Sequence, residues 1–310
     1  MVTVNDLFVK EEKFNNLPLF SISLLPLPVF NTKNIYFFWL GIRSFGNSIG
    51  FIIRHGYFMY FLIPFTLLGG IYYYGYKLQT NVFEAKLDSI NGLVWYLIYA
   101  LIEVSVGLLL MRFAKYLVVA LLSPLLAHIS EKTERIITGV KQPYSWQQFK
   151  EDIIRAVKLI IRNFIWYYLY FLIIQLIAFI FWKNPSESPL QWLNVVICAY
   201  YYGFSFMDYV NERRRRSVNE SIVFIRNHSG LAISIGLLYY FMIFVPVDLK
   251  IFFNYTLTLS NTLELFIQLF WWILASSAPI IGIVAATIAM NEIDPAKSVE
   301  SEKTNLSDEL

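Results

Sequence analysis

Six apolar segments dominate the sequence, and each is long enough to enter a lipid bilayer. They are Tyr57–Tyr76, Leu93–Leu126, Leu159–Trp182, Leu190–Met207, Gly230–Val247 and Leu263–Met290. A helix of about 20 apolar residues crosses the hydrocarbon core of a bilayer. The chain is 57% hydrophobic and only 15% charged, whereas soluble domains are about 25% charged. The pattern therefore predicts an all-α membrane protein with about six hydrophobic helices.

The segments differ in length, and the difference predicts different placements. Leu93–Leu126 has 34 residues, about 51 Å as a helix, so it must tilt strongly or continue along the membrane surface. Leu190–Met207 and Gly230–Val247 have 18 residues each, at the short end of the range. We expect these two to be candidates for re-entrant helices that do not cross fully.

Lysine and arginine are unevenly distributed between the connections. Eighteen lie in residues 1–56, 127–158, 208–229 and 291–310, against four in 77–92, 183–189 and 248–262. Cytoplasmic loops of membrane proteins retain basic residues. The asymmetry predicts six crossings with both termini in the cytoplasm.

Four consecutive arginines, Arg213, Arg214, Arg215 and Arg216, lie in the basic 208–229 connection. The net charge of +3 is too small to indicate a nucleic-acid partner. We interpret the run as a topology anchor among anionic lipid headgroups, which stabilise a basic side chain by about 1 kcal/mol each.

The ends of the chain differ from its centre, and the boundaries predict three parts. Residues 1–34 form an apolar segment with several prolines, residues 35–293 a membrane domain, and residues 294–310 a disordered polar tail. Within the domain, Ile35–Ile53 interleaves apolar residues with Arg43 and Asn47. This pattern predicts an N-terminal amphipathic helix lying at the membrane interface.

The sequence carries no recognisable enzyme motif. No Walker loop, G-x-G-x-x-G or G-x-S-x-G occurs, and the three histidines have no partners at metal-ligand spacing. We therefore predict neither an enzyme nor a metal or cofactor site. Glu103, midway along the second apolar segment, is a functional candidate because an intramembrane charge is costly. The alternative is a protonated or hydrogen-bonded packing residue.

A short pattern recurs three times, as Ile-Ile-Arg-His ending at His55, Ile-Ile-Arg-Asn ending at Asn163 and Phe-Ile-Arg-Asn ending at Asn227. Each copy lies at the predicted cytoplasmic end of an apolar segment. One interpretation is that each arginine anchors its own helix end. The other is that Arg54, Arg162 and Arg226 converge on one anion path.

Several stretches resemble the CysZ-like family, the bacterial sulfate permeases grouped with the etoposide-induced membrane proteins. The first is Gly41-Ile-Arg-Ser-Phe45 followed by Arg54–Pro64. The others are Ser123–Gly139, then Asp208-Tyr209 with the basic loop, Ser221–Arg226 and Gly230–Gly236, and last Ala278–Thr287. No single motif is specific, but their order and spacing are similar over about residues 35–293.

The resemblance implies helices of which some cross the membrane only in part, an oligomer, here a homo-oligomer, and the handling of oxyanions. Sulfate-moving members carry an Arg-Arg pair just after the glycine that opens the first membrane helix. Here Phe58 and Met59 occupy those positions. Arg54 and His55, just before Gly56, are the candidates to bind an anion from the other side of the turn, with Arg43 nearby in sequence.

Two functions remain open at this point. One is a passive transporter or channel for sulfate or a related small inorganic anion, in the inner membrane of a bacterium. The other is a non-transporting membrane scaffold or biogenesis factor that has lost the sulfate site.

Overall fold

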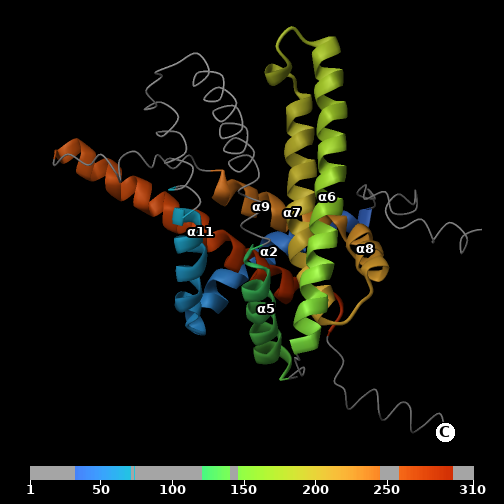
Figure 1. Cartoon of the computed structure of the whole chain (residues 1–310), viewed down its shortest axis with the longest axis vertical. Helices are drawn as coiled ribbons and strands as arrows, with labels where there is room; N and C mark the ends of the chain where they lie inside the picture. Colours follow the sequence, from blue (N-terminus) through green and yellow to red (C-terminus); the bar gives the residue numbers. More distant parts are fainter. Residues whose placement is uncertain (1–31, 71–72, 74–120, 140–145, 245–257, 296–310) are drawn as a thin grey trace, which may run out of the picture.

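The computed structural model describes residues 32–70, 73, 121–139, 146–244 and 258–295. Within these residues all regular structure is helical (Figure 1). The elements are α2 (Thr32–Arg54), η2 (Tyr57–Phe61), α5 (Ser123–Thr138), α6 (Trp146–Phe181), η3 (Pro185–Glu187), α7 (Leu190–Arg213), α8 (Val218–Asn227), α9 (Ser229–Ile243) and α11 (Leu259–Ile293). The helix that η2 opens continues to Gly70.

Two helices in the described residues are long and apolar enough to cross a membrane, within Ile161–Phe181 of α6 and Ser260–Ile293 of α11. Two further pairs of helices pass the same test only together. One joins α2 to the helix Tyr57–Gly70 at a bend of 111°, and the other joins α8 to α9 at 85°. The described chain thus holds two to four candidate spans, and the predicted number of about six is not confirmed. Most of Leu93–Leu126, including Glu103, lies outside the described residues.

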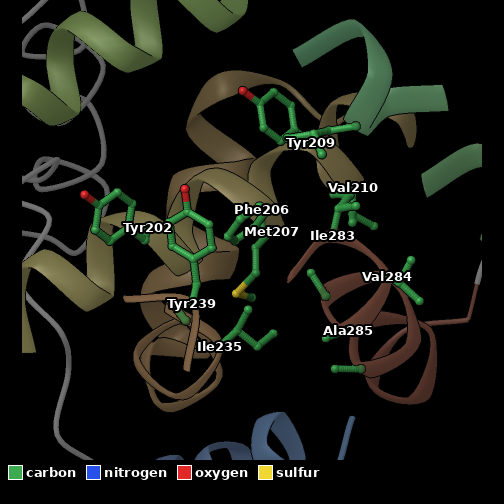
Figure 2. Close-up of a cluster of buried hydrophobic side chains, with 14 of the residues drawn as sticks. Tyr202, Phe206, Met207, Tyr209, Val210, Ile235, Tyr239, Ile283, Val284 and Ala285 are labelled. Carbon is green, nitrogen blue, oxygen red and sulfur yellow. The ribbon is translucent and has the colours of Figure 1, made fainter. Parts of the chain in front are cut away.

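The core forms where α7, α9, α2 and α11 pack together. Figure 2 shows Phe206 and Met207 of α7 close to Tyr239 of α9, with Val284 of α11 further to the right; all four are buried. Two glycines bring α7 and α9 close, because an added Cβ at Gly203 would lie 1.8 Å from a carbonyl oxygen of α9 and one at Gly236 1.7 Å from a carbonyl oxygen of α7. Small residues at such crossings are typical of helices packed in membranes.

The helix predicted to lie at the interface instead packs into the core. One face of α2 buries polar Asn34, Ser44 and Ser48 against α9 and α11, whereas Ile35 and Trp39 are exposed. A helix lying on a bilayer directs its polar face to water and its apolar face to lipid. Here part of the polar surface of α2 packs inside the protein while large apolar side chains face outwards, so the prediction of an N-terminal interfacial helix is not confirmed.

The helices α6 and α7 lie side by side and extend beyond the rest of the described chain (Figure 1). Gln175 and Gln191 join them by side-chain hydrogen bonds of 3.0 and 3.3 Å. Only 11% of the apolar stretch of α6 is buried, against 72% of that of α11. So large an exposed apolar surface suits contact with lipid.

Two residue types set the ends of α5, the helix that faces the candidate site. Pro124 occupies the first turn, where its missing N–H costs nothing. Gly139 ends the helix with φ 74°, a left-handed conformation that glycine adopts without steric cost. Pro124 and Gly139 therefore mark the two ends of α5.

Candidate functional site at the Gly56 turn

Gly56 forms a sharp turn between two helices. α2 ends at Arg54, Gly56 has φ 66° and ψ 43°, and the next helix begins at Tyr57. A side chain at this φ is strained. The chain bends by 111° here over a short break. The C-terminal end of α2 and the N-terminal end of the next helix are therefore adjacent.

The helix that starts at Tyr57 has glycine as its N-cap and so has no side-chain cap. The first amides of a helix have no acceptor within it, and the helix dipole makes this end attractive to negative charge. Helix N-termini of this kind bind sulfate, phosphate and carboxylate groups. By position, the amides concerned are those of Tyr57, Phe58 and Met59.

The candidate residues predicted from the sequence lie in different surroundings. Arg54 is exposed. His55 donates a hydrogen bond of 2.9 Å from Nδ1 to the carbonyl of Phe51, and the two rings are in contact at a tilt of 35°. Arg43 lies three turns earlier on α2, with a guanidinium nitrogen 3.9 Å from the Glu292 carboxylate at the surface. Arg54 and His55 therefore flank the Gly56 turn, whereas Arg43 is paired elsewhere.

The helix that begins at Tyr57 is attached to α5 by hydrogen bonds between side chains. The buried Tyr57 hydroxyl lies 3.2 Å from the Thr133 hydroxyl, and the Tyr60 hydroxyl lies 3.2 Å from Nε2 of His128. These contacts join residues 76 and 68 positions apart in sequence. They fix the turn against one face of α5.

α5 brings cations to the turn that the sequence analysis did not single out. The ammonium nitrogen of Lys132 lies 4.6 Å from the ring centre of Tyr57 and 5.1 Å from that of Tyr60. Arg135 also acts electrostatically on the Tyr57 hydroxyl. The signal was present, because His128, Lys132 and Arg135 recur at i, i+4 and i+7 and so share a helix face.

An open groove of about 630 Å³ lies beside the turn. Its walls come from the second half of α2, the end of α5 and the end of α11. The lining residues are Gly46, Asn47, Gly50, Phe51, Arg54, Ile137, Ile288, Asn291 and Glu292. Arg54 is the only cation among them, and Glu292 the only anion, so the groove carries both charges.

The sequence matches the family model described as sulfate transporter CysZ/etoposide-induced protein 2.4 over residues 44–253. The match covers two thirds of the chain, including the Gly56 turn, α5 and the basic connection after α7.

The chain belongs to the CysZ/etoposide-induced protein family.

This confirms the resemblance seen in the sequence. No curated protein matches the chain.

At the positions where sulfate-moving CysZ-like proteins carry an arginine pair, this chain presents Phe58 and Met59 to the outside. Their side chains are 58% and 79% exposed. Neither side chain can bind an anion through a charge. The positive charges at the turn therefore come from Arg54 and from the facing helix, α5.

In this member of the family, two of the four consecutive arginines are turned into the protein. Arg213 and Arg214 both form ion pairs with the carboxylate of Glu134, and their side chains are 8% and 7% exposed. Arg216 pairs with Asp294, just after α11. The anchoring of topology by this run stays a prediction, but Arg213 and Arg214 bind a buried carboxylate.

Arg162 and Arg226 of the recurring pattern act on one tyrosine. Arg162 is buried, with its guanidinium carbon 5.9 Å from the Phe204 ring centre. Both arginines act electrostatically on the Tyr200 hydroxyl. Arg54, the third member, lines the groove instead. The described residues thus bring two of the three together.

Glu103 falls outside the described residues, so its predicted role stays a prediction. Within the described part of the chain, no group of three His, Cys, Asp or Glu residues could hold a metal ion.

Proposed function

We propose that this chain is a passive membrane pathway for sulfate or a related oxyanion, and that the anion binds at the Gly56 turn. The observation that carries the proposal is the concentration of positive charge around an uncapped helix N-terminus in a member of the CysZ family. Guanidinium groups and helix N-terminal amides together bind tetrahedral anions.

The described arginines differ in whether a carboxylate lies close to them, and this contrast supports the location. Arg43, Arg155, Arg213, Arg214 and Arg216 each pair with a carboxylate within 4.0 Å. Among the described residues no carboxylate lies that close to Arg54. Charges neutralised within the fold stabilise it, whereas a cation without such a partner is available to a ligand.

The test is sulfate uptake into liposomes that contain the purified protein, with Arg54→Gln and His55→Gln combined in one variant. A hydrogen bond to a charged group contributes about 1.5–3 kcal/mol, so we expect uptake to fall roughly tenfold or more. Lys33→Gln, an exposed lysine at the start of α2, is the matched control. Unchanged uptake in the double variant removes Arg54 and His55 from the site.

The alternative function is a non-transporting scaffold or biogenesis factor, and the exposed apolar pair Phe58 and Met59 favours it. Large apolar side chains at the positions of a ligand-binding pair suit contact with a partner or lipid. This alternative predicts no flux of any anion. It also predicts a co-purifying partner that is lost when Phe58 and Met59 are replaced by serine.

We place the protein in the inner membrane of a bacterium as a homo-oligomer, with both termini in the cytoplasm. The proposed sidedness rests on the eighteen basic residues in the connections assigned to the cytoplasm, against four in the others. A cysteine-accessibility assay on intact cells would test it, with the native Cys198 replaced by serine and single cysteines introduced at Lys183 and Lys297.

A further inference from the structure

Lys132 occupies a defined position between two aromatic rings rather than extending into solvent. Its side chain is half-buried, and its ammonium nitrogen lies within 5.1 Å of the ring centres of both Tyr57 and Tyr60. Aromatic faces attract an ammonium group. The two rings therefore hold the ammonium of α5 beside the first turn of the helix that begins at Tyr57.

The rings do not neutralise this charge. Among the described residues no carboxylate lies within ion-pair distance of Lys132, and the same holds for Arg135. Glu134, two residues further along α5, points to another side of the helix and is committed to Arg213 and Arg214. An ammonium has three N–H donors and no acceptor, so contact with ring faces leaves donors available to an anion.

Two hydrogen bonds, made by residues before and after Lys132 in α5, fix the position of Lys132 relative to the helix that begins at Tyr57. Thr133, its neighbour on α5, is hydrogen-bonded to Tyr57, and His128, one turn earlier, to Tyr60. A ligand-binding cation needs such support, because a loosely held one loses rotamer entropy when it binds.

We propose that Lys132 binds the oxyanion directly and supplies, from α5, the positive charge that the arginine pair supplies in sulfate-moving relatives. The site is then shared between two elements, with helix amides and Arg54 on one side and Lys132 on the other. Arg135, one turn further along the same face, adds to the field without contacting the anion. This inference rests on the proposed function and names a residue that the family pattern does not.

A site built this way favours a doubly charged tetrahedral anion over chloride. Several donors that converge from two helices match an ion with four oxygen atoms. Chloride has one charge and no directional acceptors. Loss of Lys132 therefore weakens sulfate binding more than chloride binding.

The experiment compares four full-length proteins in detergent and in liposomes: the unaltered chain, Lys132→Met, Lys132→Arg and Lys183→Met. Lys183 is an exposed lysine in the α6–α7 connection and is the control for general loss of charge. Binding of radiolabelled sulfate gives the affinity, and uptake of sulfate and chloride gives the flux. Size-exclusion profiles and thermal midpoints without anion check the fold, and Lys132→Gln replaces Lys132→Met if that variant does not fold.

We expect Lys132→Met to bind sulfate about tenfold more weakly, Lys132→Arg to stay within about threefold, and Lys183→Met to be unchanged. If the unaltered chain binds and carries sulfate but Lys132→Met does so with equal affinity, the role of Lys132 is overturned and the proposed function stands. If the unaltered chain neither binds nor carries sulfate, the proposed function is overturned, and this inference with it.

Discussion

Arg214 donates two hydrogen bonds to one carboxylate oxygen of Glu134, from Nε at 3.1 Å and from Nη2 at 2.7 Å. The two residues are 80 positions apart, and their side chains are 7% and 2% exposed. Arg213 binds the other oxygen of the same carboxylate. This contact ties α5, which faces the candidate site, to the turn between α7 and α8.

Replacing Glu134 with glutamine should destabilise the protein strongly. The change leaves two buried guanidinium groups without their carboxylate, and breaking a buried ion pair from one side costs about 3–5 kcal/mol. A thermal unfolding midpoint in detergent measures the effect. Glu264→Gln, at an exposed site on α11, should leave the midpoint within error. Equal midpoints for the two variants would show that the Glu134 contact contributes little.

The folded protein should lose stability at acid pH because of Glu134. Burial alone raises the pKa of this carboxyl, but the charges and hydrogen bonds of Arg213 and Arg214 outweigh burial and hold the pKa below its ordinary value of 4.5. A lowered folded-state pKa gives stability that is complete above the ordinary pKa and is lost as pH falls towards the folded value.

The measurement is the thermal midpoint at pH values from about 7 down to about 3. The unaltered chain should lose stability below about pH 4.5, and Glu134→Gln should lose less over the same range. Identical acid profiles for both proteins would contradict the assignment.

The close approach of α7 and α9 predicts that alanine at Gly203 is destabilising. The new Cβ would lie 1.8 Å from the carbonyl oxygen of Ala232, so the helices must separate. Overpacking a core costs about 1–3 kcal/mol or more. The control is Gly46→Ala on α2, where no atom lies within 4 Å of the added carbon and alanine gains up to about 1 kcal/mol of helix propensity. We expect opposite shifts of the thermal midpoint.

The Gly56 turn should not tolerate a β-branched residue. At φ 66° a valine is strained by about 1–2 kcal/mol, whereas asparagine adopts this conformation more readily. Sulfate uptake should fall in Gly56→Val and be largely retained in Gly56→Asn, because only valine displaces the start of the next helix. Equal uptake in both would mean that the turn does not position the site.

Part of this fold follows from the sequence because long apolar runs dominate their local structure. The expected segment Leu159–Trp182 lies within α6 except for its last residue, Trp182, which follows the helix. The expected segment Leu263–Met290 lies entirely within α11. The short segment Gly230–Val247 corresponds to α9, which with α8 forms a broken pair, consistent with the expectation that it does not cross alone.

The rest depends on contacts between segments that are far apart in the sequence. The mixture of polar and apolar residues in α2 predicted an interfacial helix, which is not confirmed, because Ser44 and Ser48 are buried within the protein. Arg54, His55 and Gly56 could be singled out from the sequence because they adjoin one another in the chain. Lys132 could not be placed from the sequence alone, because it reaches the same turn from a helix far along the chain, and the binding of Glu134 by Arg213 and Arg214 is likewise a contact between distant residues.

The most direct test of the central claim is uptake of labelled sulfate into liposomes that contain the purified, folded chain, with phosphate and chloride as competing anions. We predict uptake down the sulfate gradient without added energy, reduced by excess unlabelled sulfate far more than by chloride. If folded protein carries no sulfate above empty liposomes, the chain is not an oxyanion pathway, and the exposed pair Phe58 and Met59 becomes the place to look for a partner.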